Sequence, residues 1–152
     1  MSTKSLSPSR HPDPLAASSG VHGEIHRHLD ELATLVEVLQ GSQADEVQRW
    51  RMRAVLAFFS GPARRHHIEE ERQVFPTLLA SGDIDLRRIV ERLREDHAWI
   101  ELHWLDIQPH LTAAARGAAS LDPSALRSAV GEFVKIVRHH MAVEASLPGL
   151  ME

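Results

Sequence analysis

Apolar residues recur every three or four positions in four long stretches of this chain, which is the pattern of amphipathic helices. The stretches cover residues 21–40, 44–80, 86–114 and 122–147. Gly61-Pro62 interrupts the second stretch and predicts a break in that helix. Asp122-Pro123 predicts the start of the last one, with Asp122 as the N-cap. No stretch alternates apolar and polar residues, so we expect an all-α, up-down-up-down four-helix bundle.

The N-terminal part of the chain lacks this period. Residues 1–20 are rich in Ser and Pro and end in Gly20, and we predict a disordered tail there, followed by a bundle over residues 21–152. The net charge of -4 does not favour nucleic acid or an anionic membrane as a partner. No apolar run is long enough to span a membrane, and no apolar leader is evident, so we expect a cytoplasmic protein.

The chain has no cysteine and eleven histidines. Without cysteine there are no disulfides and no thiolate ligands. A histidine is followed by a glutamate four residues later in four places, namely His66 with Glu70, His67 with Glu71, His97 with Glu101 and His140 with Glu144. Residues four apart share one face of a helix, so each pair could bind a single ion.

Several of these polar residues fall on the apolar stripes of their helices. His140 and Glu144 continue the stripe of Phe133 and Val137, and His97 continues the stripe of Leu93. An unpaired buried carboxylate is costly, whereas a cation would compensate several such groups at once. In the first helix two stripes compete, one with His26 and one with His28.

These motifs resemble the bacterial hemerythrin-like (HHE cation-binding) domains. The resemblance covers residues 21–150 and rests on four segments: His26, then His66-His67-x-x-Glu70-Glu71 followed by Phe75-Pro76, then Asp96-His97-x-x-Ile100, then His140-x-x-x-Glu144. It implies a four-helix bundle around a non-haem di-iron centre. The metal ligands that it implies are His26, His66, Glu70, His97, His140 and Glu144.

One position departs from the oxygen-carrying members of that family. They have a second histidine four residues after the first on the third helix, where this chain has Glu101. We expect Glu101 either to bind metal as a further ligand or to orient His97. An anionic ligand favours ferric iron over reversible oxygen carriage. Two alternatives stay open, with His28 in place of His26, and with His67 and Glu71 in place of His66 and Glu70.

The resemblance implies a cytoplasmic di-iron protein with an oxo or carboxylate bridge. It would bind or react with dioxygen, peroxide or nitric oxide in sensing, stress defence or iron handling. The sequence does not decide whether the protein is an enzyme, and we leave a homodimer open. The alternative from a different class is a mononuclear or metal-free helical bundle that serves as an interaction module.

Overall fold

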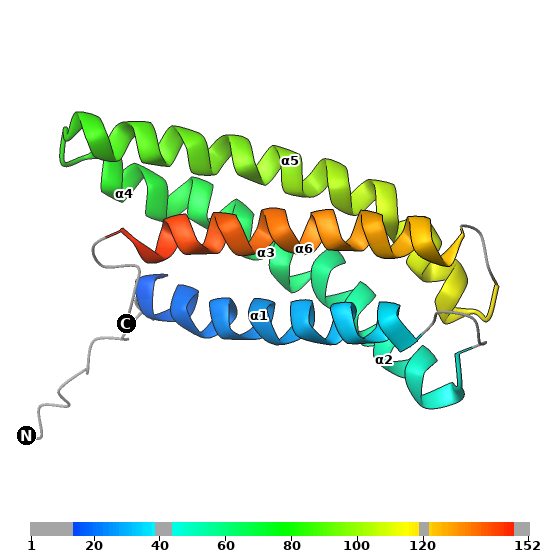
Figure 1. The fold of residues 1–152 in the computed structure, drawn as a ribbon. Helices are drawn as coiled ribbons and strands as arrows, with labels where there is room; N and C mark the ends of the chain where they lie inside the picture. Colours follow the sequence, from blue (N-terminus) through cyan, green and yellow to red (C-terminus); the bar gives the residue numbers. More distant parts are fainter. Residues whose placement is uncertain (1–13, 39–43, 119–121, 148–152) are drawn as a thin grey trace, which may run out of the picture.

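The computed structural model describes residues 14–38, 44–118 and 122–147, with side chains from residue 20 onward. The bundle's four helices are α1; a second helix made of α2, α3, the π-helical turn η1 and α4; α5; and α6 (Figure 1). Their bounds are α1 Pro14–Val38, α2 Glu46–Ser60, α3 Pro62–Glu69, η1 Glu70–Val74, α4 Phe75–Leu79, α5 Ile84–Ala115 and α6 Pro123–Ala145. Successive helices run in opposite directions, which confirms the predicted up-down-up-down bundle.

The helix starts follow the expected capping chemistry, with one difference. The Asp122 side chain accepts a hydrogen bond from Ala125 N, and Pro123 opens α6 as predicted. However, α1 begins at Pro14 rather than at Val21, so residues 14–20 are helical where we expected a tail. Proline is well suited to a first helical turn. The rest of the predicted tail, residues 1–13, and the predicted helix end at Gly41-Ser42 lie outside the described residues.

The second helix is broken at Gly61, as predicted, and α3 begins at Pro62. Farther along, Phe75 N–H donates to Glu70 O, five residues back, in the wide turn η1. Pro76 has no N–H to donate to Arg72, which interrupts the regular hydrogen-bond ladder here. Such wide turns are frequent at functional sites. This one begins at Glu70, the first predicted ligand glutamate.

The apolar core is divided into two clusters along the bundle. The larger includes Ile25, Phe59, Ile100 and Phe133. The smaller consists of Val74, Phe75, Val90, Leu93 and Leu147. On α3 to η1 and on α5, His66, Glu70 and His97 fall between the two clusters in the sequence. At the end of α6, Glu144 does the same, and His140 directly precedes Met141, the last residue of the larger cluster. A polar layer therefore separates the two halves of the core.

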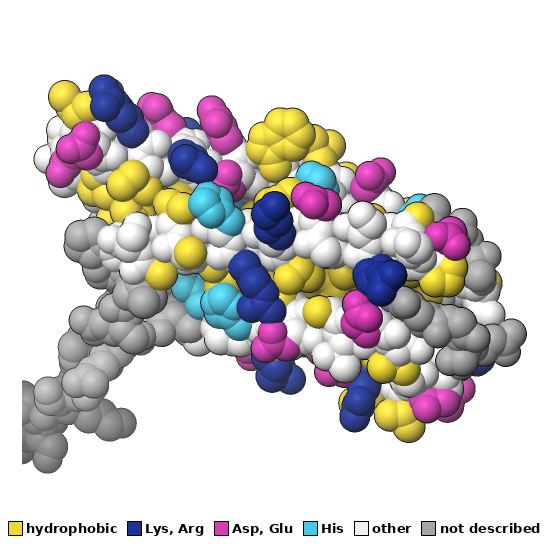
Figure 2. Space-filling view, in the orientation of Figure 1, with side chains coloured by type: hydrophobic (Ala, Val, Ile, Leu, Met, Phe, Trp, Pro, Cys, Tyr) yellow, Lys and Arg dark blue, Asp and Glu magenta, His cyan; other side chains and the backbone are white. Residues whose placement is uncertain are grey.

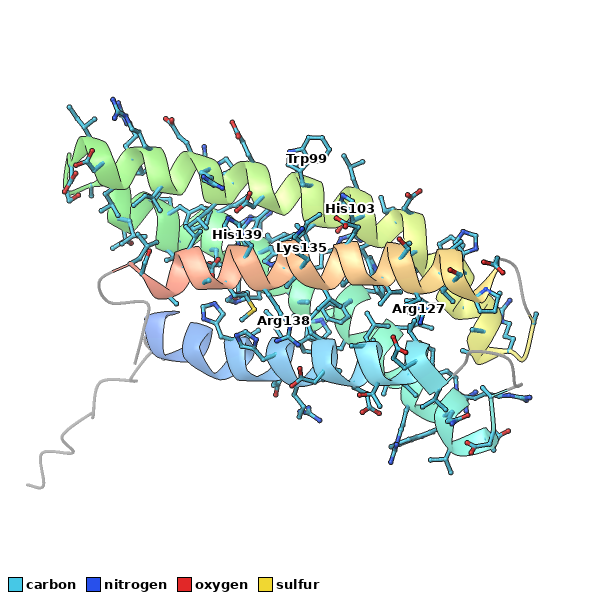
Figure 3. The ribbon with its side chains drawn as sticks, viewed as in Figure 1. Trp99, His103, Arg127, Lys135, Arg138 and His139 are labelled. Atoms are coloured by element: carbon cyan, nitrogen blue, oxygen red, sulfur yellow. The ribbon has the colours of Figure 1, made fainter. Side chains whose placement is uncertain are left out.

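The surface over α1, α5 and α6 mixes acidic and basic side chains (Figure 2). One inter-helix ion pair on this face joins Arg138 of α6 to Asp30 of α1 (Figure 3). In the described part of the chain, every helix is too short or too polar to cross a membrane.

Candidate metal centre

The polar layer contains seven histidines and glutamates from all four helices of the bundle. They are His22 from α1, His66, His67 and Glu70 from the second helix, His97 from α5, and His140 and Glu144 from α6. The four-residue spacing puts His66 with Glu70, and His140 with Glu144, on one face of each helix. Five of the seven are buried, and His22 and His67 are partly buried.

Within the described residues these side chains form two groups that could each hold a metal ion. One group is His22, His66, Glu70 and Glu144, and the other is His67, Glu70, His97 and His140. In each group, one ligand atom from every residue lies within 4.8 Å of the others. Glu70 belongs to both groups. The two candidate groups are therefore adjacent and share one carboxylate.

The two buried glutamates each connect a histidine of one group with a histidine of the other. Glu70 Oε1 lies 3.0 Å from His66 Nε2 and 3.5 Å from His97 Nε2. Glu144 Oε2 lies 2.7 Å from His22 Nε2, and its Oε1 lies 2.7 Å from His140 Nε2. Two ligands about 2.1 Å from one ion are themselves roughly 3 Å apart. These separations suit atoms that surround an ion.

The types of atom in the cluster also suit a metal ion. Eight buried side-chain atoms in the described residues have no partner in hydrogen-bond geometry. They are the Nε2 atoms of His22, His66, His97 and His140 and both carboxylate oxygens of Glu70 and Glu144. Buried polar atoms without partners are rare and costly. Imidazole nitrogen and carboxylate oxygen are also the donors that iron and related cations accept, so the residues present fit a metal centre.

Two further carboxylates contact the outer ring nitrogens of two of the three buried histidines, among the described residues. His97 Nδ1 lies 3.2 Å from Glu71 Oε1, and His140 Nδ1 lies 3.2 Å from Asp96 Oδ2. Such contacts fix the ring orientation and leave Nε2 directed at a metal. His97 and His140 both belong to the group with His67. That group therefore has two orienting carboxylates behind its histidines.

The buried carboxyls respond differently to the same environment. Burial, opposed by His66 and reinforced by Glu144, raises the pKa of Glu70 to about 7. Burial also acts against ionised Glu144, but its contacts with His140 and His22 prevail and lower its pKa. Without metal, Glu70 therefore titrates near pH 7, whereas Glu144 is ionised.

The histidines divide in a similar way. Burial and the nearby His140 lower the pKa of His97 to about 4. Burial and the neighbouring imidazoles hold the pKa of His67 well below its ordinary value. For His22 and His140, burial opposes the charged form, but contact with Glu144 raises the pKa of each. His97 and His67 are thus neutral at pH 7, which is the form that binds metal.

On α1 the structure brings His22, and neither His26 nor His28, to the centre. His26 is exposed. The ring of His28 stacks on Phe58 at 3.8 Å, away from both groups. The buried stripe on this helix is Ile25, Leu29, Leu32 and Val36. Extended backward by three residues, that stripe reaches His22, so the signal was present in the sequence.

Two further predictions concerned His67 and Glu101. The structure places His67 in the cluster and Glu101 outside it. The carboxylate of Glu101 pairs with Arg64, and the Glu101 side chain is 33% exposed. Its expected role toward His97 is taken by Glu71. The ring of His67 stacks on that of His97 at 4.2 Å. Both neighbours in the His66-His67 pair therefore face inward, and they belong to different groups.

A four-helix bundle with an inner layer of clustered imidazole and carboxylate atoms has the fold and the donor set of a metal-binding helical protein. The sequence matches the family model described as the Hemerythrin HHE cation binding domain over residues 13–147. Because this match covers most of the chain, the protein belongs to that family. Neither the curated proteins nor the solved structures gave a match to the chain.

Proposed function

We propose that the protein is a non-haem di-iron protein that binds or reacts with dioxygen, peroxide or nitric oxide. The observation that carries this proposal is the set of eight buried nitrogen and oxygen atoms that have no partner in hydrogen-bond geometry, which fall into two groups joined by Glu70. A single tetrahedral site needs about four ligands, so this donor set suits two ions better than one. The absence of cysteine and the mixture of imidazole and carboxylate favour iron.

The ligand assignment follows the two groups. His22 and His66 would hold one ion, and His67, His97 and His140 would hold the other. Glu70 and Glu144 would contribute to both, because each lies against a histidine from either group. His26 and Glu101, which the sequence suggested, are left out of this set, and His22 and His67 replace them.

The chain's own residues would prepare the centre rather than carry out the redox chemistry. The two apolar clusters exclude water from the polar layer on both sides. Asp96 and Glu71 orient His140 and His97. Bound iron would supply the change of oxidation state and the affinity for a small ligand.

The test is iron loading of the purified protein under anaerobic conditions, followed by elemental analysis and absorption spectroscopy. We expect about two iron atoms per chain and a near-ultraviolet charge-transfer band after oxidation. A folded protein that retains one metal ion or none would contradict the proposal and favour the alternative, a mononuclear or metal-free interaction module. Stopped-flow mixing of the reduced protein with dioxygen, peroxide or nitric oxide would then identify the ligand to which it responds.

A further inference from the structure

We propose that a small cavity beside His67 is the route by which an uncharged ligand of two or three heavy atoms reaches the centre, and that the ion pair of Arg64 with Glu101 selects what enters. The inference rests on the proposed function, because the ligand admitted is the one that the metal centre would bind. The family match assigns no role to Arg64, Glu101 or this cavity, and neither residue belongs to a metal group.

The cavity lies where α3, α5 and α6 meet the end of α2. Its inner wall is apolar and consists of Phe59, Ala63, Ile100, Trp104 and Phe133. All five of these side chains are buried. The Trp104 ring is fixed in that wall, because its Nε1 donates to Ser60 Oγ at 3.3 Å. The cavity is therefore shaped by rigid side chains of the larger core cluster.

The size of the cavity limits what it can hold. The volume open to the centre of a water-sized molecule is about 20 Å³. One water molecule needs about 10–15 Å³ by this measure. A diatomic molecule or hydrogen peroxide fits such a space, whereas an organic substrate does not.

One end of the cavity reaches the metal centre. His67 lines the cavity and is the one residue of its lining that belongs to either metal group among the described residues. Its ring stacks on His97 at 4.2 Å and lies 5.7 Å from the ring of His140. A molecule in the cavity is thus next to the group that contains these three histidines.

The other end of the cavity is lined by two opposite charges. Arg64 and Glu101 line it and pair with each other, and their side chains are 52% and 33% exposed. A surface ion pair contributes little to stability, so it can open readily and does not seal the path. An anion that moves inward would lose water against apolar walls, while an uncharged molecule loses little. The compensated pair adds no net charge that would attract an anion.

Quenching of Trp104 fluorescence in the metal-free protein tests this path directly. Trp50 and Trp99 are 65% and 59% exposed, so Trp50→Phe with Trp99→Phe leaves Trp104 as the single fluorophore in a folded background. Three quenchers are compared. Dioxygen is small and neutral, acrylamide is larger and neutral, and iodide is an anion. We expect quenching by dioxygen and very little by acrylamide or iodide.

The variants give results of opposite sign. Glu101→Gln leaves Arg64 uncompensated at the mouth, which should raise iodide quenching about threefold at low salt. Arg64→Gln leaves a negative charge and should not raise it. Ala63→Leu fills the cavity and should reduce dioxygen quenching. Arg65→Gln, a neighbouring exposed arginine that does not line the cavity, is the matched control.

Each outcome decides the proposal, provided that circular dichroism shows unchanged helicity. Equal iodide quenching in Glu101→Gln, Arg64→Gln and Arg65→Gln would overturn the selective role of the ion pair. Unchanged dioxygen quenching in Ala63→Leu would overturn the route. Because no iron is present, these results are independent of the metal-loading test. A failure of iron binding with the expected quenching pattern would refute the proposed function and leave the path intact.

Discussion

Asp96 on α5 and His140 on α6 are joined across the bundle by a contact of 3.2 Å between Asp96 Oδ2 and His140 Nδ1. Asp96 stands next to His97 in the sequence, yet it orients the histidine of another helix. His97 is oriented in turn by Glu71 of η1. The outer carboxylates therefore link three helices through the imidazoles that face the centre.

Removing the Asp96 carboxylate should weaken metal binding without removing a ligand. We expect Asp96→Ala to lower the affinity about 10–100-fold, because the His140 ring loses its orienting partner. Competition with a chelator of known affinity measures this change. Asp106→Ala removes an exposed carboxylate from the same helix and should have no effect. Equal affinities for the two variants would show that the contact with His140 has no role in binding.

Glu70 should matter more than any single histidine, because it is the residue common to both groups. We expect Glu70→Ala to lose both metal ions, and His140→Ala to lose iron mainly from the group with His97. Elemental analysis after gel filtration gives the stoichiometry. His103→Ala is the control, since this half-buried residue of α5 belongs to neither metal group. Retention of two ions by Glu70→Ala would refute the shared-carboxylate arrangement.

His22 and His26 provide a direct test of the helix phase of α1. We expect His22→Ala to reduce iron retention strongly and His26→Ala to leave it unchanged, because His22 Nε2 lies 2.7 Å from Glu144 Oε2 and His26 is exposed. The two variants carry the same chemical change one helical turn apart. The reverse result would show that α1 is rotated or shifted when metal is bound.

Much of the fold follows from local signals in the sequence. The helix break at Gly61 and the N-cap at Asp122 are consequences of backbone chemistry and needed no tertiary information. The π-helical turn at Glu70 was not predicted. Pro76 has no N–H for the carbonyl of Arg72, and the turn depends on how the surrounding structure accommodates that carbonyl. The pattern of nearby residues in the sequence does not determine this.

The site was less accessible to sequence reasoning where two stripes compete. On α6 the apolar period leads directly to His140 and Glu144, and both are buried. On α1 the histidines are close together, so an error of one turn exchanges His22 and His26. The position of Glu101 depends on Arg64, which lies 37 residues away in the chain. Such a long-range pairing leaves no periodic signal.

Metal binding should depend on pH through Glu70. The pKa of this carboxyl is raised from 4.5 to about 7 in the metal-free protein, first of all by burial. Below pH 7 the metal must displace a proton from Glu70. It must also displace protons from His22 and His140, since contact with Glu144 outweighs burial and raises the pKa of each, whereas the pKa of His97 is lowered to about 4 and this imidazole is already neutral. The apparent affinity should therefore fall by about tenfold or more per pH unit below 7.

Metal affinity is a better readout of this titration than the stability of the metal-free protein. A raised pKa means that the contribution of Glu70 to stability is present below pH 4.5 and is lost as the pH rises through 7. The lowered pKa of His97 has the opposite effect, since its contribution is present above pH 6.5 and is lost as the pH falls through 4. The two contributions offset each other between these limits. Chelator competition from pH 5.5 to 8.5 avoids the cancellation, and Glu69→Gln, an exposed neighbour, is the control. An affinity for metal that does not change between pH 5.5 and 7 would show that Glu70 is not a ligand that must lose a proton.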